Sequence, residues 1–151
     1  MKVSSTTRRA LLKSLTFMSA IVMMPKLVLA AWPKKAFEDD SVEAAITELY
    51  GTASEPSDQV TLKAPDIAEN GAVVPISVTT DLPNVESISI YVEQNPNPLA
   101  ATFELSKSSL ADVSTRIKMG TTSNVIAAVK SGDKVYTVSR EVKVTIGGCG
   151  G

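Results

Sequence analysis

The sequence predicts an all-β fold, an immunoglobulin-like β-sandwich of about seven strands with one short N-terminal helix and a flexible C-terminal arm. Three observations lead to this prediction. Apolar residues alternate with polar ones in a series of short segments, which are separated by turns rich in proline, asparagine and glycine. One segment ahead of them has helical periodicity. The final segment runs into four glycines that surround one cysteine.

Residues 1–30 have the layout of an export signal, which the mature chain would lack. Arg8 and Arg9 resemble a twin-arginine signal and precede an apolar stretch of about ten residues, too short to cross a bilayer as a helix. Small residues at Val28 and Ala30 favour cleavage after Ala30. The alternative is a short buried or membrane-anchoring helix. The export interpretation places the mature protein in the periplasm, without a membrane anchor.

One short helix is expected at the start of the mature domain, which spans residues 31–146. The apolar residues that share its predicted inner face are Val42, Ala45, Ile46 and Leu49. Asp40 followed by Glu43 resembles a capping box, and Gly51 is expected to end the helix.

The predicted strands follow in a regular series. They are Val60–Lys63, Val73–Thr80, a segment around Ile88–Val92, Ala100–Leu105, Val113–Met119, Asn124–Val129 and Lys134–Ile146. Pro75 cannot donate to a ladder, so it indicates an edge strand or a bulge. The run Asn95-Pro96-Asn97-Pro98 must form a turn.

Composition excludes several classes of function. Residues 1–30 hold five of the 15 basic residues and no acidic one, which leaves ten basic against 16 acidic residues and a net charge of −6. Such a surface does not favour nucleic acid or anionic lipid. The chain has no histidine, which removes the usual general base and the commonest metal ligand. We therefore expect no cofactor, no metal site and no catalytic activity.

Residues 147–151 form a Gly-Gly-Cys-Gly-Gly arm, and the lone thiol of Cys149 is the candidate functional group. The flanking residues Gly147, Gly148, Gly150 and Gly151 have no Cβ, so this segment is expected to be flexible. An extended arm places the sulfur about 10 Å beyond Ile146. A thiolate with that reach can enter a partner's pocket and attack other sulfur centres.

Other interpretations of the arm remain open. Cys149 could be an accidental residue in a disordered tail, or it could join two chains in a disulfide-linked homodimer, as in an exported β-sandwich assembly module. The ending Gly150-Gly151 also resembles carriers that hold sulfur as a C-terminal thiocarboxylate, but the export signal and the all-β pattern disfavour them. An enzyme is disfavoured because Asp39, Asp40 and Glu43 are better explained as helix-terminus acids.

The chain resembles the SoxY family, the sulfur-carrier subunits of the periplasmic thiosulfate-oxidising (Sox) system. The segments that carry the resemblance are Arg8-Arg9, the GGCGG arm at 147–151, Asn70-Gly71-Ala72-Val73-Val74-Pro75-Ile76 and Asn95-Pro96-Asn97-Pro98.

The resemblance implies that Cys149 holds pathway intermediates covalently. A c-type haem enzyme would join thiosulfate to it oxidatively as a cysteine S-thiosulfonate, and a sulfate-releasing hydrolase would then remove the terminal sulfone. The resemblance also implies a heterodimer with a SoxZ-like subunit, a small β-sandwich without its own signal.

Overall fold

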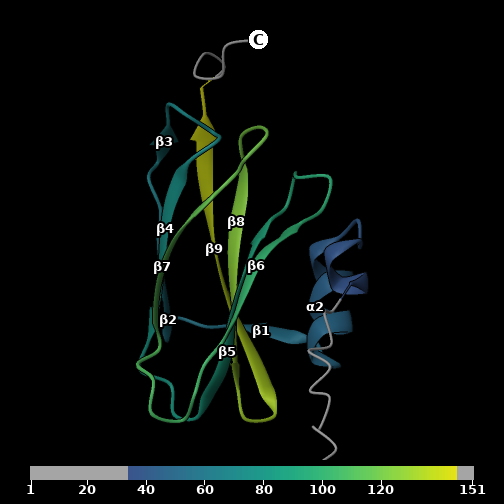
Figure 1. Cartoon of the computed structure of the whole chain (residues 1–151), viewed down its shortest axis with the longest axis vertical. Coiled ribbons are helices and arrows are strands. Elements are labelled where there is room, and N and C mark those ends of the chain that lie inside the picture. The colour runs from purple at the N-terminus through teal and green to yellow at the C-terminus, as the bar shows by residue number, and fades with distance from the viewer. Residues whose placement is uncertain (1–33, 146–151) are drawn as a thin grey trace, which may run out of the picture. The chain divides into compact units, whose positions relative to one another are not determined.

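The structure, a computed structural model, describes residues 34–145, which form two packed β-sheets with a helix beside the larger one (Figure 1). The predicted export signal, its arginines and its cleavage site, and the arm with Cys149, lie outside the described residues. The elements are η1 (Lys35–Phe37), α2 (Val42–Tyr50), β1 (Ser54–Pro56), β2 (Val60–Lys63), β3 (Ile67–Ala68), β4 (Val74–Thr80), β5 (Val85–Val92), β6 (Leu99–Glu104), β7 (Asp112–Ile117), β8 (Ser123–Ser131) and β9 (Lys134–Val144).

The larger sheet has the strand order β1-β9-β8-β5-β6, and β3 pairs with β9 as well. The smaller sheet has the order β2-β4-β7. β1 and β3 run parallel to β9, β1 beside its beginning and β3 beside its end, whereas the other pairs are antiparallel. The predicted immunoglobulin-like sandwich is confirmed, with nine strands between residues 34 and 145 in place of about seven.

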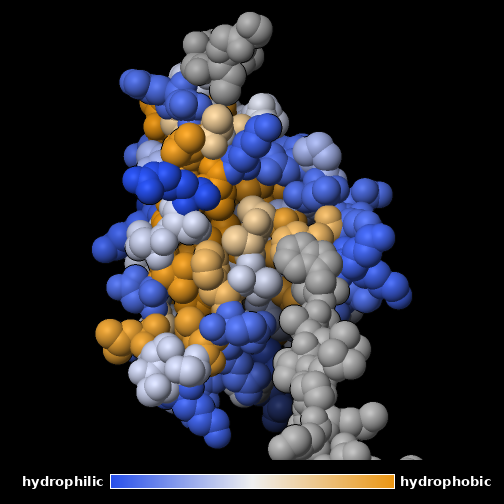
Figure 2. Space-filling view, viewed as in Figure 1, coloured by the Kyte–Doolittle hydropathy of each residue, from blue (hydrophilic) through white to orange (hydrophobic). Residues whose placement is uncertain are grey.

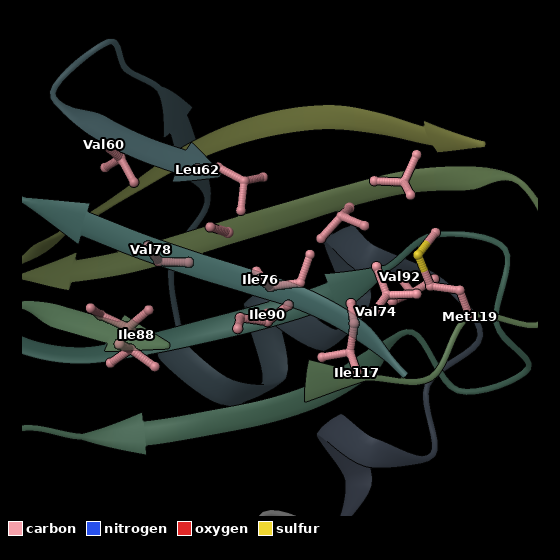
Figure 3. Packing of buried hydrophobic residues seen from close by; sticks show 14 of the residues in the cluster. Val60, Leu62, Val74, Ile76, Val78, Ile88, Ile90, Val92, Ile117 and Met119 are labelled. Carbon is pink, nitrogen blue, oxygen red and sulfur yellow. The ribbon is translucent and has the colours of Figure 1, made fainter. Parts of the chain in front are cut away.

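The core lies between the two sheets and is built from alternate residues of facing strands (Figure 3). β4 contributes Val74, Ile76 and Val78, and β5 contributes Ile88, Ile90 and Val92, all of them buried. Burial of each such side chain contributes about 1.5–3 kcal/mol. The period of two along these strands is therefore explained by one face packing inward while the other faces outward.

A second apolar cluster holds α2 against the opposite face of the larger sheet. Val42, Ala45 and Ile46 pack there with Tyr91, Leu99, Ala128 and Val135. Ser41 caps the helix, because its Oγ accepts a 3.2 Å hydrogen bond from the Ala44 backbone N–H. The capping box predicted from Asp40 is therefore wrong by one residue. Gly51 ends the helix as predicted, in the left-handed region at φ 71°.

Most predicted strands are found within two residues of their expected bounds, and β2 coincides with its prediction. The edge strand or bulge predicted from Pro75 is wrong, because β4 is the middle strand of the smaller sheet and pairs with β7 in one continuous register. Pro75 lies beyond the residues of β4 that pair with β2, so the ladder tolerates its missing donor. β1 and β3 were not predicted from the sequence.

No helix among residues 34–145 is long and apolar enough to span a membrane.

Candidate functional site

The structure describes the chain up to Thr145, four residues before Cys149. The segment from Lys143 to Thr145, here called the arm root, is the part of the candidate site whose geometry is known. The arm root lies at one end of the sandwich, next to β3 (Figure 1).

Hydrogen bonds hold the arm root on both sides. β3 pairs with it in parallel, and the backbone N–H groups of Lys143 and Thr145 donate to the carbonyls of Asp66 at 3.0 Å and Ala68 at 3.1 Å. On the other side β8 pairs with β9 only as far as Val142. Beyond that point the Val144 N–H donates instead to Oγ1 of Thr122, at 3.0 Å. The last described residues before the arm are thus fixed in an extended conformation.

Gly71 occupies a position at the arm root where no side chain fits. Its carbonyl accepts a 2.7 Å hydrogen bond from the Met119 N–H. A Cβ at this glycine would lie 2.5 Å from the Met119 carbonyl oxygen and 2.9 Å from Cγ1 of Val144. The glycine therefore allows three segments to pack closely where β9 ends.

Asn95 fixes the loop between β7 and β8 from its other side. Its Nδ2 donates to the Lys118 carbonyl at 2.9 Å, and its Oδ1 accepts from the Gly120 N–H at 3.1 Å. This loop, residues 118–122, contains both Met119 and Thr122. The turn 95–98 and the segment 70–76, which carried the resemblance, therefore both contact the loop that holds the arm root.

The electrostatics of the arm root are mild. Arg140 forms a 2.7 Å ion pair with Asp66, but both side chains are largely exposed, so it contributes little to stability. Lys143 is exposed and forms no ion pair with another described residue. Within residues 34–145 no cluster of three or more histidine, cysteine or acidic side chains could hold a metal ion.

Two tyrosines lie away from the arm root, the half-buried Tyr50 at the end of α2 and the buried Tyr91 in β5. The Tyr50 hydroxyl lies 2.6 Å from Oγ of Ser89, which in turn donates to Oγ1 of Thr102 at 2.8 Å. Burial raises the pKa of Tyr50 above its usual value of 10.0. Tyr91 is fully buried, and burial raises its pKa strongly as well. Because both hydroxyls stay protonated and enclosed, they serve packing.

The residues that hold the arm root were not recognised as functional from the sequence. Thr122, Gly71 and Asn95 have no chemistry of their own, and their role depends on contacts between distant segments. The only signal was that Gly71 and Asn95 stand in the two internal segments that carried the resemblance.

The family model for the sulfur oxidation protein SoxY matches residues 46–149. The match includes all nine strands and ends on Cys149. The chain belongs to the SoxY family.

A solved SoxY structure supports the assignment. The sulfur carrier protein SoxY from Chlorobium limicola f thiosulfatophilum is 41% identical, with a TM-score of 0.62, and the match covers 68% of this chain and 94% of that one. An engineered protein also matches, at 16% identity and a TM-score of 0.40, over 58% of this chain and 20% of its own. No curated protein sequence matches the chain.

Proposed function

We propose that this chain is a sulfur carrier of periplasmic thiosulfate oxidation and that Cys149 holds the sulfur covalently. Membership of the SoxY family and 41% identity to a protein described as a sulfur carrier support the role. The observation that carries the residue assignment is that the chain has one cysteine and that the family match ends on it. Attachment through cysteine sulfur therefore has one possible site.

The chemistry needs a thiol and an external oxidant. Thiosulfate joins the Cys149 thiol as an S-thiosulfonate, with release of two electrons and one proton, and a c-type haem enzyme accepts the electrons. Hydrolysis by a second enzyme then consumes one water, releases sulfate and a proton, and leaves a persulfide on Cys149. The carrier is not a catalyst in this scheme.

The fold supports presentation of the sulfur to these enzymes. Cys149 is four positions after Thr145, so their Cα atoms are at most ~14 Å apart. Because Thr145 is hydrogen-bonded to Ala68, the sandwich supplies a fixed base and the arm supplies the reach. Twin-arginine export through Arg8 and Arg9, cleavage after Ala30 and pairing with a SoxZ-like subunit belong to the same proposal.

The substitution Cys149→Ser tests the proposal. The variant should be exported and should unfold at the same temperature as the wild type, since the changed residue lies beyond the hydrogen-bonded sandwich. Thiosulfate-dependent oxygen uptake by cells that carry only this variant should be lost. Retained uptake would show that Cys149 is not the carrier residue. Retained uptake together with loss of a disulfide-linked dimer would support the assembly-module alternative.

A further inference from the structure

We propose that the bond between Asn70 and Gly71 is a site of isoaspartate formation, and that the closed arm root determines how fast this modification proceeds. The two residues stand at the start of the turn 70–73, which packs against Val144 near the end of β9. The inference goes beyond the proposed function, because it concerns a chemical change of the backbone and does not depend on what Cys149 carries.

The sequence makes Asn70 the most reactive of the five asparagines in the chain. An asparagine forms a succinimide ring when the backbone nitrogen of the next residue attacks its Cγ, and a bulky side chain on that next residue hinders the attack. Asn70 is followed by glycine, which has no Cβ. Asn84 and Asn124 are followed by β-branched valine. Asn95 and Asn97 are followed by proline, which has no N–H to lose.

The reaction has two steps and needs only water. In the first step the Gly71 nitrogen loses its proton and forms a bond to Cγ of Asn70. The C–N bond of the side-chain amide breaks, and the amide group takes up a proton and leaves as ammonia. In the second step water opens the ring at either carbonyl. One product has aspartate at position 70, and the major product has isoaspartate, in which the main chain is longer by one methylene group.

The folded chain holds Asn70 in a conformation that does not lead to the ring. Its Oδ1 accepts a 2.9 Å hydrogen bond from the Ala72 N–H, and its carbonyl accepts one of 3.2 Å from the Val73 N–H. The first of these bonds is an Asx turn. Ring closure requires Cγ to approach the Gly71 nitrogen from outside the plane of its peptide group, so the side chain and the main chain must rotate and release these bonds.

Gly71 cannot make this rotation while the arm root is closed. It is buried, and its carbonyl accepts a 2.7 Å hydrogen bond from the Met119 N–H. A Cβ at this position would lie 2.5 Å from the Met119 carbonyl oxygen and 2.9 Å from Cγ1 of Val144, so not even a methyl group fits beside it. The peptide group rotates only when the Met119 loop or the end of β9 moves away. The rate of conversion is therefore proportional to the fraction of chains whose arm root is open.

Burial does not limit the other steps of the reaction. Asn70 and Ala72 are both exposed. Figure 2 shows hydrophilic side chains at this end of the sandwich, where β3 and β9 end in Figure 1. Water therefore reaches the amide and the ring, and the protection comes from the fixed backbone.

The isoaspartate product does not fit the closed arm root. The added methylene between positions 70 and 71 displaces the backbone of Gly71, where the neighbouring atoms leave no room for a methyl group. The hydrogen bond to Met119 and the close contact with Val144 cannot both form again. The converted chain therefore keeps an open arm root, and the sandwich no longer gives the arm a fixed base.

The first test follows conversion of Asn70 in the mature chain, purified with any subunit that accompanies it. The folded chain and the chain unfolded in urea are incubated in mildly alkaline buffer, and isoaspartate is measured by peptide mapping with an isoaspartate methyltransferase. We expect conversion to be at least about tenfold slower in the folded chain. Folded Thr122→Val, which lacks the acceptor for the Val144 N–H, should convert about two- to tenfold faster than its matched control Thr121→Val. In urea the two variants should convert at the same rate.

The second test measures what the modification does to the fold. The converted fraction is separated from the unmodified chain by its additional negative charge, and hydrogen exchange is measured at the Val144 amide. Asn70→Asp is the matched control, because it has the same charge and a main chain of normal length. We expect exchange to be at least about tenfold faster in the isoaspartate form than in Asn70→Asp, which should match the wild type.

Conversion at equal rates in the folded and the unfolded chain would overturn the inference, as would an unfolded chain in which Asn70 stays intact. Equal rates in folded Thr122→Val and Thr121→Val would also overturn it, because opening of the arm root would not then limit the reaction. Equal exchange at Val144 in the isoaspartate form and in Asn70→Asp would contradict the structural consequence. These readouts do not involve sulfur, so their failure is distinct from failure of the proposed function.

Discussion

The backbone N–H of Val144 donates a 3.0 Å hydrogen bond to Oγ1 of Thr122. This bond continues the ladder of β9 for two residues beyond Val142, the last residue of β9 that pairs with β8. Thr122 belongs to the same loop whose other residues are fixed by Gly71 and Asn95. The loop between β7 and β8 is therefore the structural support from which the arm leaves the sandwich.

Thr122→Val should loosen the arm root without changing the volume of the side chain. Loss of the acceptor should lower the free energy of unfolding by about 0.5–1.5 kcal/mol, measured in urea, and should speed hydrogen exchange at the Val144 amide. Thr121→Val is the matched control, since the Thr121 side chain forms no hydrogen bond to the rest of the described sandwich. Equal exchange rates at Val144 in the two variants would contradict the role of Thr122.

Gly71→Ala should be destabilising because its new methyl group meets backbone. The Cβ would lie 2.5 Å from the Met119 carbonyl oxygen, and two hydrogen-bonded segments would have to separate to admit it. The expected loss is about 1–3 kcal/mol in the free energy of unfolding. Gly120→Ala provides the control, because the nearest atom to its Cβ is Oδ1 of Asn95 at 3.8 Å. Similar unfolding midpoints for both variants would refute the close packing at Gly71.

Deletion of Gly147 and Gly148 should slow the reactions of Cys149 with partner enzymes and leave its reactivity toward small reagents unchanged. The deletion shortens the maximum reach by ~7 Å. We expect enzymatic loading of Cys149 to slow at least tenfold, whereas its reaction with a small thiol reagent should keep its rate. Replacement of both glycines by alanine keeps the length and serves as the control. If the deletion and the replacement slow loading equally, reach is not the property that matters.

Tyr50 and Tyr91 should respond differently to loss of the hydroxyl. Tyr50→Phe removes the partner of Ser89 and should lower the free energy of unfolding by about 1 kcal/mol. The Tyr91 hydroxyl is buried and has no hydrogen-bond partner among residues 34–145, so Tyr91→Phe should be neutral or stabilising. A larger loss for Tyr91→Phe than for Tyr50→Phe in urea unfolding would contradict this assignment.

The same tyrosines predict the response to alkali. Burial raises both folded pKa values above the unfolded value of 10.0, so above that pH the unfolded chain releases protons first. The contribution of the two protonated hydroxyls to the free energy of unfolding is complete below pH 10. It is lost as the pH rises through their folded pKa values. The free energy of unfolding should therefore fall as the pH rises above about 10, and fall less in Tyr91→Phe. A parallel fall in that variant would contradict the contribution of Tyr91.

The strands that alternation predicts are those whose inner faces fill the core, and this explains which elements the sequence reveals. β4 and β5 bury Ile76 and Ile90 at every second position, so their pattern is visible in the chain. β1 and β3 are three and two residues long and are defined by parallel pairing with β9, which is far away in sequence. No local pattern reports such a pairing.

The candidate site also has one part that the sequence reveals and one part that it does not. The thiol of Cys149 is evident from the sequence because it is a single reactive group among glycines. The arm root is not evident, since Thr122, Gly71 and Val144 come together only when three distant segments pack. The helix cap is Ser41 and not Asp40 as predicted. Either side chain can accept the hydrogen bond, and only the backbone conformation decides between them.

The most direct test of the central proposal is the intact mass of the protein isolated from the periplasm of thiosulfate-grown cells, before and after reduction. We expect adducts with the masses of sulfane and thiosulfonate groups, mapped to Cys149 and removed by reductant. A bare thiol, or a disulfide between two chains as the only modification, would contradict it.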